Sequence, residues 1–103
     1  MPTRNELISY ALDFASYLLA QLNGINRIIL FGSVARGDFD RKSDVDLFID
    51  TKNIKLEKEV LNLAETFHRT QKAKNWKLKG VNNDFSCNVG NLDSEELKDL
   101  KRG

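Results

Sequence analysis

The chain has 103 residues, of which 41% are hydrophobic and 30% are charged, and its formal net charge is +1. These values exclude disordered and fibrous proteins and predict one soluble globular domain over residues 1–103. The longest apolar run, Ile28–Phe31, is far shorter than the roughly 20 residues that span a bilayer, so we expect no membrane partner and a cytoplasmic location.

An amphipathic helix is predicted near the N-terminus. Thr3 and Glu6 have the spacing of a capping box, and Asn23-Gly24 supplies a stop signal. Between them, apolar side chains recur at helical intervals, at Leu7, Tyr10, Ala11, Phe14, Leu18 and Leu22. We expect this stripe to pack on a core.

A short strand and a sharp turn follow the helix. The β-branched, almost wholly apolar run from Arg27 to Phe31 predicts a strand that is covered on both faces and ends at Gly32-Ser33. Gly32 lets an anion approach the backbone, and Ser33 stands where a helix N-cap would. If residues 34–36 form a helical turn, their free amides and the Ser33 hydroxyl converge in a phosphate-binding geometry.

A second predicted strand, Val45–Asp50, carries an acidic face. Its odd-numbered residues are apolar, and carboxylates alternate with them at Asp44, Asp46 and Asp50. Asp44 and Asp46 project from one face, close enough to share a hard cation, and would otherwise repel each other. Ten residues separate Ser33 from Asp44. Together, the turn and the acidic pair predict a metal–nucleotide site.

The rest of the chain predicts further helices and strands. An amphipathic helix from Leu56 to Phe67 frays into a basic run, Phe85–Val89 reads as a strand, and Trp76–Leu78 reads as an optional short one. Asp93 and Glu96 cap a last helix that carries Leu97 and Leu100. The fold class is therefore α/β (α+β), a small mixed sheet flanked by helices.

Three other features have simple structural interpretations. Cys87 is the lone cysteine and is most simply a small buried residue, and His68 is interpreted as a helix-surface histidine. Between Lys52 and Lys79, eight Lys or Arg residues face three Glu. This basic stretch is read as a solvated helix surface, with a nucleic-acid surface as the less favoured alternative.

The segment from Leu30 to Asp50 resembles the signature of the polymerase-β-type nucleotidyltransferase superfamily, in particular its small prokaryotic and archaeal minimal nucleotidyltransferase group. The pattern is Gly-Ser, then Ala-Arg-Gly, then Ser-Asp-x-Asp-Leu. Here these motifs are Gly32-Ser33, Ala35-Arg36-Gly37 and Ser43–Leu47. The match is specific over about twenty residues, and beyond Asp50 the likeness is one of general layout.

The resemblance implies roles for the residues that match. Gly32 and Ser33 would bind the phosphates of a nucleoside triphosphate, expected to be ATP, and Asp44 and Asp46 would hold Mg²⁺ or Mn²⁺. Arg36 and Ser43 match the motif too and are candidate nucleotide-binding residues. Arg36 could instead brace the loop against Asp38 or Asp40.

Such enzymes usually add a third carboxylate from a neighbouring strand. Asp84 is the acid beside the Phe85–Val89 strand, and Ser86 and Asn88 share its face. Asp84 is therefore the candidate third catalytic residue, with Asp44 and Asp46. It could instead cap the turn after Asn82-Asn83.

The resemblance implies transfer of a nucleoside monophosphate to a hydroxyl acceptor. Proteins of this group include antitoxins paired with a small helical HEPN-type protein, some of which adenylylate that partner, so a toxin–antitoxin role is expected. A HEPN-type partner or a homodimer would complete the cleft. One alternative is a catalytically degenerate domain that binds nucleotide or a partner. The other is an RNA-modifying module that binds RNA through Lys72–Lys79.

Overall fold

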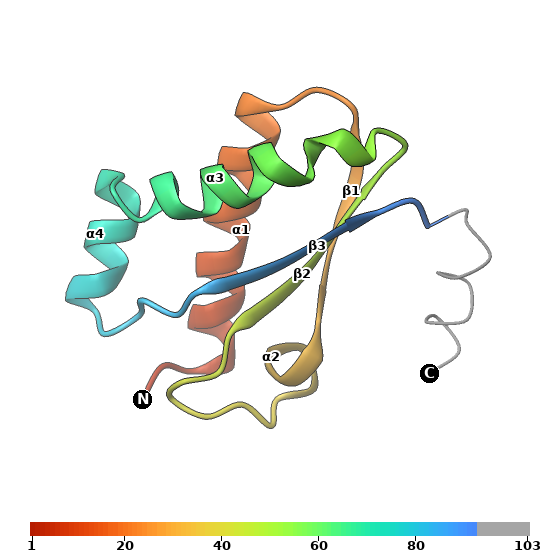
Figure 1. Cartoon of the computed structure of the whole chain (residues 1–103). Helices are drawn as coiled ribbons and strands as arrows, with labels where there is room; N and C mark the ends of the chain where they lie inside the picture. Colours follow the sequence, from red (N-terminus) through yellow and green to blue (C-terminus); the bar gives the residue numbers. More distant parts are fainter. Residues whose placement is uncertain (93–103) are drawn as a thin grey trace.

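The computed structural model describes residues 1–92 and is shown in Figure 1. The predicted helix that begins at Asp93 lies outside the described residues. The described helices and strands are α1 (Arg4–Gln21), β1 (Ile25–Phe31), α2 (Gly32–Arg36), β2 (Val45–Thr51), the 3-10 turn η1 (Ile54–Leu56), α3 (Glu57–Phe67), α4 (Gln71–Leu78) and β3 (Phe85–Gly90). Within residues 1–92, no helix combines the length and hydrophobicity that a membrane crossing requires.

The three strands form one mixed sheet in the order β1-β2-β3. β1 runs antiparallel to β2, and β2 runs parallel to β3. The register pairs Phe31 with Asp46 and Val45 with Phe85. The predicted class, a small mixed sheet flanked by helices, is therefore confirmed, and the end of β1 meets the start of β2.

The core lies between the sheet and the two longest helices, α1 and α3. From the central strand, Val45, Leu47 and Ile49 are buried, as the alternation predicts. From β3, the Phe85 ring stacks on Phe14 of α1 with a centroid separation of 4.1 Å and meets Phe67 of α3 edge-on at 5.7 Å. Both helices thus cover the same face of the sheet.

The first helix begins and ends as predicted. The Thr3 hydroxyl accepts a hydrogen bond from the Glu6 amide at 3.1 Å, and the Glu6 carboxylate accepts one from the Thr3 amide at 3.0 Å. This reciprocal pair satisfies two amides that a helix start would leave unpaired. It holds the first turn of α1, from which Arg4 reaches the candidate site.

The prediction that Arg27–Phe31 is covered on both faces is wrong. β1 lies at an edge of the described sheet, and none of its residues is fully buried. An apolar run does not show where its strand lies in the sheet. Packing of one helical layer against one face of the strand is enough to favour apolar residues in it. The prediction of the strand itself is confirmed.

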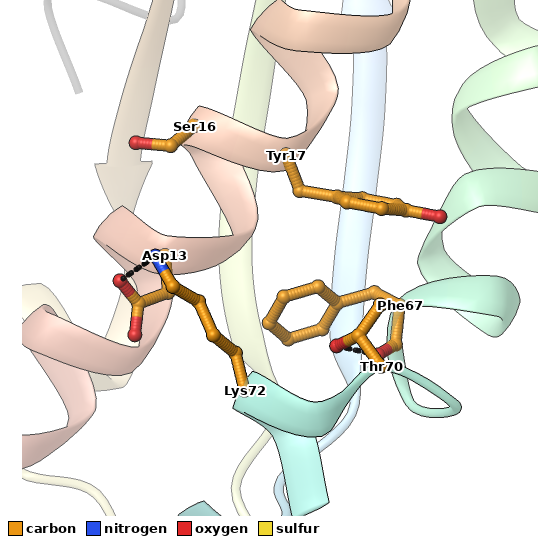
Figure 2. A pocket seen from close by; sticks show the side chains of 6 residues that line it. All are labelled: Asp13, Ser16, Tyr17, Phe67, Thr70 and Lys72. Atoms are coloured by element: carbon orange, nitrogen blue, oxygen red, sulfur yellow. Dashed lines mark hydrogen bonds and ion pairs between the residues drawn. The ribbon is translucent and has the colours of Figure 1, made fainter.

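The optional strand at Trp76–Leu78 is also wrong, because these residues belong to α4. The Thr70 hydroxyl caps this helix by accepting from the Ala73 amide at 3.2 Å. The Trp76 indole donates to the Asp13 carboxylate on α1 at 2.7 Å. Lys72, also from α4, pairs with the same carboxylate at 3.5 Å (Figure 2). This tertiary contact favours a helix where the local pattern was ambiguous.

Cys87 behaves as a packed residue. It lies on β3 against the core, and burial raises the pKa of its thiol to about 11. The thiol therefore stays protonated at neutral pH and is a poor nucleophile. The sequence predicted a buried residue, whereas Cys87 is only partly buried, although it does pack against the core.

Candidate functional site

The Gly32 turn and the Asp46 side chain touch where β1 ends and β2 begins. Gly32 follows Phe31, the residue that pairs with Asp46 across the strands. A Cβ atom placed on Gly32 would overlap Asp46 Oδ2 and lie 2.9 Å from Asp46 Cγ. Gly32 also has a φ of +75°, in the left-handed region that favours glycine. Both the backbone and the carboxylate therefore require glycine here.

The chain after Gly32 forms the predicted helical turn, but Ser33 is not its N-cap. α2 begins at Gly32, and its N-cap, Phe31, makes no side-chain capping bond. Ser33 lies in the first turn, where its carbonyl accepts from the amides of Gly37 at 2.8 Å and Asp38 at 3.1 Å. The first amides of any helix lack intrahelical partners, so this turn presents donors beside Asp46.

Asp44 and Asp46 share the sheet face opposite the helices. Their neighbours Val45 and Leu47 are buried in the core, so alternation sends both carboxylates the other way. Asp44 is exposed and Asp46 is half-buried. Burial raises the pKa of Asp46, the charge of Asp44 raises it further, and Arg36 lowers it. This response to both neighbours indicates that the three groups interact electrostatically.

The other two motif residues are Arg36, the last residue of α2, and Ser43, in the loop between α2 and β2. Arg36 braces the loop, because its Nε donates to the Asp38 carboxylate at 3.2 Å. The Ser43 hydroxyl accepts from the Asp40 amide at 2.9 Å and donates to the Asp40 carboxylate at 3.3 Å. Ser43 thus closes a local turn, and a nucleotide contact for Ser43 or Arg36 stays a prediction.

Comparison with known proteins identifies the family of the chain. A sequence profile described as "Nucleotidyltransferase domain" matches residues 16–101, which is most of the chain. The chain belongs to this nucleotidyltransferase domain family. The superfamily resemblance drawn from the motifs is therefore confirmed.

One curated relative comes from Methanocaldococcus jannaschii and is provisionally named a protein adenylyltransferase. It is 54% identical to this nucleotidyltransferase domain over 46 residues, which are 42% of this chain and 46% of the relative. The match thus spans less than half of the relative's length. No solved structure gives a significant match.

Asp84, the predicted third carboxylate of the nucleotidyltransferase domain, faces away from the acidic pair. It directly precedes β3, and its carbonyl accepts from the Val45 amide at 2.9 Å, so its backbone lies beside the start of β2. Its side chain is 85% exposed and lies 3.8 Å from His68 Nε2, next to α3. The structure therefore does not bring Asp84 together with Asp44 and Asp46. His68, interpreted as a plain surface residue, has Asp84 as its neighbour.

Asp50, the third acid of the predicted acidic face, is structural. It is 3% exposed and forms an ion pair with Arg27 Nε at 2.9 Å across the sheet. Its other oxygen accepts from the Leu92 amide at 3.0 Å. This buried carboxylate has a donor from each of two neighbouring segments and so stabilises the sheet. Asp50 lies five residues from the end of β2 that carries the candidate site.

Arg4 is a supporting residue that sequence reasoning missed. Its guanidinium donates to the Val34 carbonyl at 3.2 Å and to the Ala35 carbonyl at 2.8 Å, so α1 holds the C-terminal carbonyls of α2. A cation at the C-terminal end of a helix also complements its dipole. The contact spans about thirty residues of sequence, and no local pattern around Arg4 signals it.

The acidic pair fits a magnesium ion that also contacts a nucleotide. Within residues 1–92, no three His, Cys, Asp or Glu side chains are grouped so that they could hold a metal ion. Two carboxylates suffice for Mg²⁺ when substrate phosphates and water complete the octahedron. The mutual repulsion of Asp44 and Asp46 is the property that a bound cation would relieve.

We expect Asp46→Asn to stabilise the metal-free protein at pH 7, and this gain should shrink as the pH falls. The folded-state pKa of Asp46 lies above its ordinary value of 3.8, so the native state favours the protonated form of Asp46 more than the unfolded state does. Ionised Asp46 therefore destabilises the fold above its raised pKa, and protonation removes that penalty as the pH falls toward 3.8. Urea denaturation of both proteins between pH 7 and pH 4 measures the difference. A difference that is independent of pH would contradict the raised pKa.

Proposed function

We propose that this nucleotidyltransferase domain transfers an adenylyl group from ATP to a hydroxyl of a protein acceptor, using Mg²⁺ or Mn²⁺. One observation carries the proposal: the carboxylate of Asp46 fills the space that a side chain on Gly32 would need, and the charge of Asp44 acts on this carboxylate. A phosphate-binding turn and a cation-binding pair at one point are what a metal–triphosphate complex needs. The provisional name of the curated relative supports adenylyl transfer to protein.

The chemistry is a single displacement at the α-phosphorus. The acceptor oxygen forms a bond to the α-phosphorus. The bond between the α-phosphorus and the oxygen that bridges it to the β-phosphate breaks, and pyrophosphate leaves. The proton of the hydroxyl passes to solvent. A divalent cation, when bound, neutralises charge that develops on the phosphate oxygens.

Each motif residue has a task in this proposal. Asp44 and Asp46 hold the cation, while Ser33 and the first amides of α2 hold the departing pyrophosphate. Arg36, which lies within electrostatic reach of Asp46, adds positive charge to the same region. Arg4 stabilises the position of α2 by donating hydrogen bonds to its carbonyls.

The acceptor we propose is a small helical HEPN-type partner protein, in a toxin–antitoxin pair. The support is the resemblance of the motif segment to minimal nucleotidyltransferases that are paired with such proteins.

A second candidate function is binding without transfer. Asp84 faces His68, and residues 1–92 contain no other acid grouped with the pair as a third ligand. Without a base near the acceptor, transfer would be slow even with nucleotide bound. The domain would then act by binding nucleotide or its partner.

A labelling experiment separates these two functions. The protein is incubated with Mg²⁺ and a HEPN-type protein from the same genome, and with ATP radiolabelled at either the α- or the γ-phosphate. We expect label on protein in a denaturing gel from α-labelled ATP and none from γ-labelled ATP. Metal-dependent ATP binding without label on either protein would favour binding alone. The absence of ATP binding would contradict both adenylyl transfer and nucleotide binding, and would leave only binding of a partner.

A further inference from the structure

Asn83 is a buried polar residue that joins three segments. It lies just before β3 and is 9% exposed. Its side-chain Nδ2 donates to the Ser43 carbonyl at 2.7 Å and to the Arg41 carbonyl at 3.4 Å. Its own carbonyl accepts from the Tyr10 hydroxyl of α1 at 2.6 Å. Burial raises the pKa of Tyr10, so this phenol stays protonated and donates.

These bonds hold the backbone on both sides of Asp44. The carbonyl of the residue before it, Ser43, is held by the Asn83 amide. The amide of the residue after it, Val45, is held by the Asp84 carbonyl. Asp44 is therefore held on each side by consecutive residues, Asn83 and Asp84, although it lies outside the strand and is exposed.

The rest of the loop that leads to Asp44 depends on local contacts. The Asp40–Ser43 bonds and the Arg36–Asp38 pair join near neighbours in sequence. Phe39 packs against the core at the start of the loop. Within the described residues, Asn83 is the residue that is distant in sequence from the loop and whose side chain donates hydrogen bonds to it just before Asp44.

We propose that Asn83 is the positioning residue of the cation site, which keeps the carboxylate of Asp44 beside that of Asp46. This rests on the proposed function, in which the pair holds Mg²⁺ or Mn²⁺. Two like charges drive each other apart, and an exposed loop residue would yield most easily. Fixing the backbone of Asp44 before a cation arrives spares the cost of ordering it during binding.

The test compares Asn83→Ala with Tyr10→Phe. Both changes remove hydrogen bonds from the same buried network, but Tyr10→Phe leaves the Asn83 amide on the Ser43 carbonyl. Free Mn²⁺ is titrated by electron paramagnetic resonance, without nucleotide and then with ATP, below the unfolding range of each protein. We expect both variants to melt at lower temperature, while Asn83→Ala alone weakens Mn²⁺ binding by about tenfold to a hundredfold, the usual effect of losing a partner that orients a ligand. If Asn83→Ala does not fold, Asn83→Ser is measured instead and should weaken Mn²⁺ binding in the same direction.

Each result decides between the proposals. Wild-type Mn²⁺ affinity in the Asn83 variant would overturn the positioning role and leave the proposed function standing. Equal losses in Asn83→Ala and Tyr10→Phe would also overturn it, because the effect would then follow general stability. Mn²⁺ binding that depends on Asn83 without any binding of ATP would support the positioning role and count against nucleotidyl transfer. A wild-type protein that binds no Mn²⁺ would contradict both.

Discussion

Replacing both Asp44 and Asp46 by Asn is expected to abolish the rise in melting temperature that Mg²⁺ with ATP gives the wild-type protein. A ligand at a hundred times its dissociation constant stabilises the folded state by about 2.7 kcal/mol. For a domain of this size that is a rise of roughly 10–20 °C, at about 4–8 °C per kcal/mol. The double variant loses the cation and with it the triphosphate, so its melting temperature should not respond. Differential scanning fluorimetry measures this.

The metal-free double variant should be at least as stable as the wild type. Asn keeps the shape of Asp but carries no charge, so it removes the cost of burying a charge, which is the main cause of the raised pKa of Asp46, and the repulsion from Asp44, which adds to it. The matched control is Glu57→Gln with Glu59→Gln, which removes two exposed carboxylates from the start of α3. This control should keep the full response to Mg²⁺ and ATP. A double Asp variant that still responds would place the nucleotide elsewhere.

The parts of the site that a local pattern specifies could be predicted from the sequence. Alternation along β2 predicted that Val45 and Leu47 enter the core, and their burial leaves Asp44 and Asp46 on the other face. The capping box at Thr3 likewise specified where α1 begins. These features depend on residues within a few positions of one another, so sequence spacing is enough.

The parts that depend on distant segments could not be predicted. Asp84 falls on the acidic side of the sheet by alternation, yet its exposed carboxylate lies by His68, a residue from a different element. Asp50 shares the acidic face by alternation, but Arg27 on the neighbouring strand pairs with it. Arg4 and Asn83 support the site through contacts with segments thirty to forty residues away. Nothing in the sequence near any of these residues specifies its partner.

Gly32 also shows that a correct residue can be predicted for an incomplete reason. The sequence suggested that glycine lets a phosphate approach the backbone. In the structure the atom already against Gly32 is Oδ2 of Asp46, so the glycine first makes room for the carboxylate that we propose as a ligand of the cation. Approach of a phosphate to the same turn stays a prediction. The space for the Asp46 carboxylate and the space for a phosphate would then both require glycine at this one position.

Gly32→Val is expected to abolish nucleotide binding, whereas Ser33→Ala should only weaken it. A side chain at residue 32 would displace the Asp46 carboxylate and would have to adopt a φ of +75°. It therefore damages the cation site, the turn and the space for phosphate together. Ser33→Ala removes a single charge-assisted hydrogen bond, about 1.5–3 kcal/mol at most, or roughly a ten- to 150-fold loss of affinity. Calorimetric titration with ATP and Mg²⁺ measures both.

Gly24→Ala separates this effect from simple backbone strain. Gly24 has a φ of +91°, but a Cβ there would meet no atom within 4 Å. Forcing Ala into a left-handed conformation should cost about 1–2 kcal/mol of stability at either glycine. Gly24→Ala should therefore melt at lower temperature yet bind ATP and Mg²⁺ like the wild type, while Gly32→Ala, with the smallest added side chain, should already lose most binding. Equal binding losses for Gly32→Val and Ser33→Ala, or wild-type affinity in Gly32→Ala, would show that the turn is structural and that the phosphates bind away from Asp46.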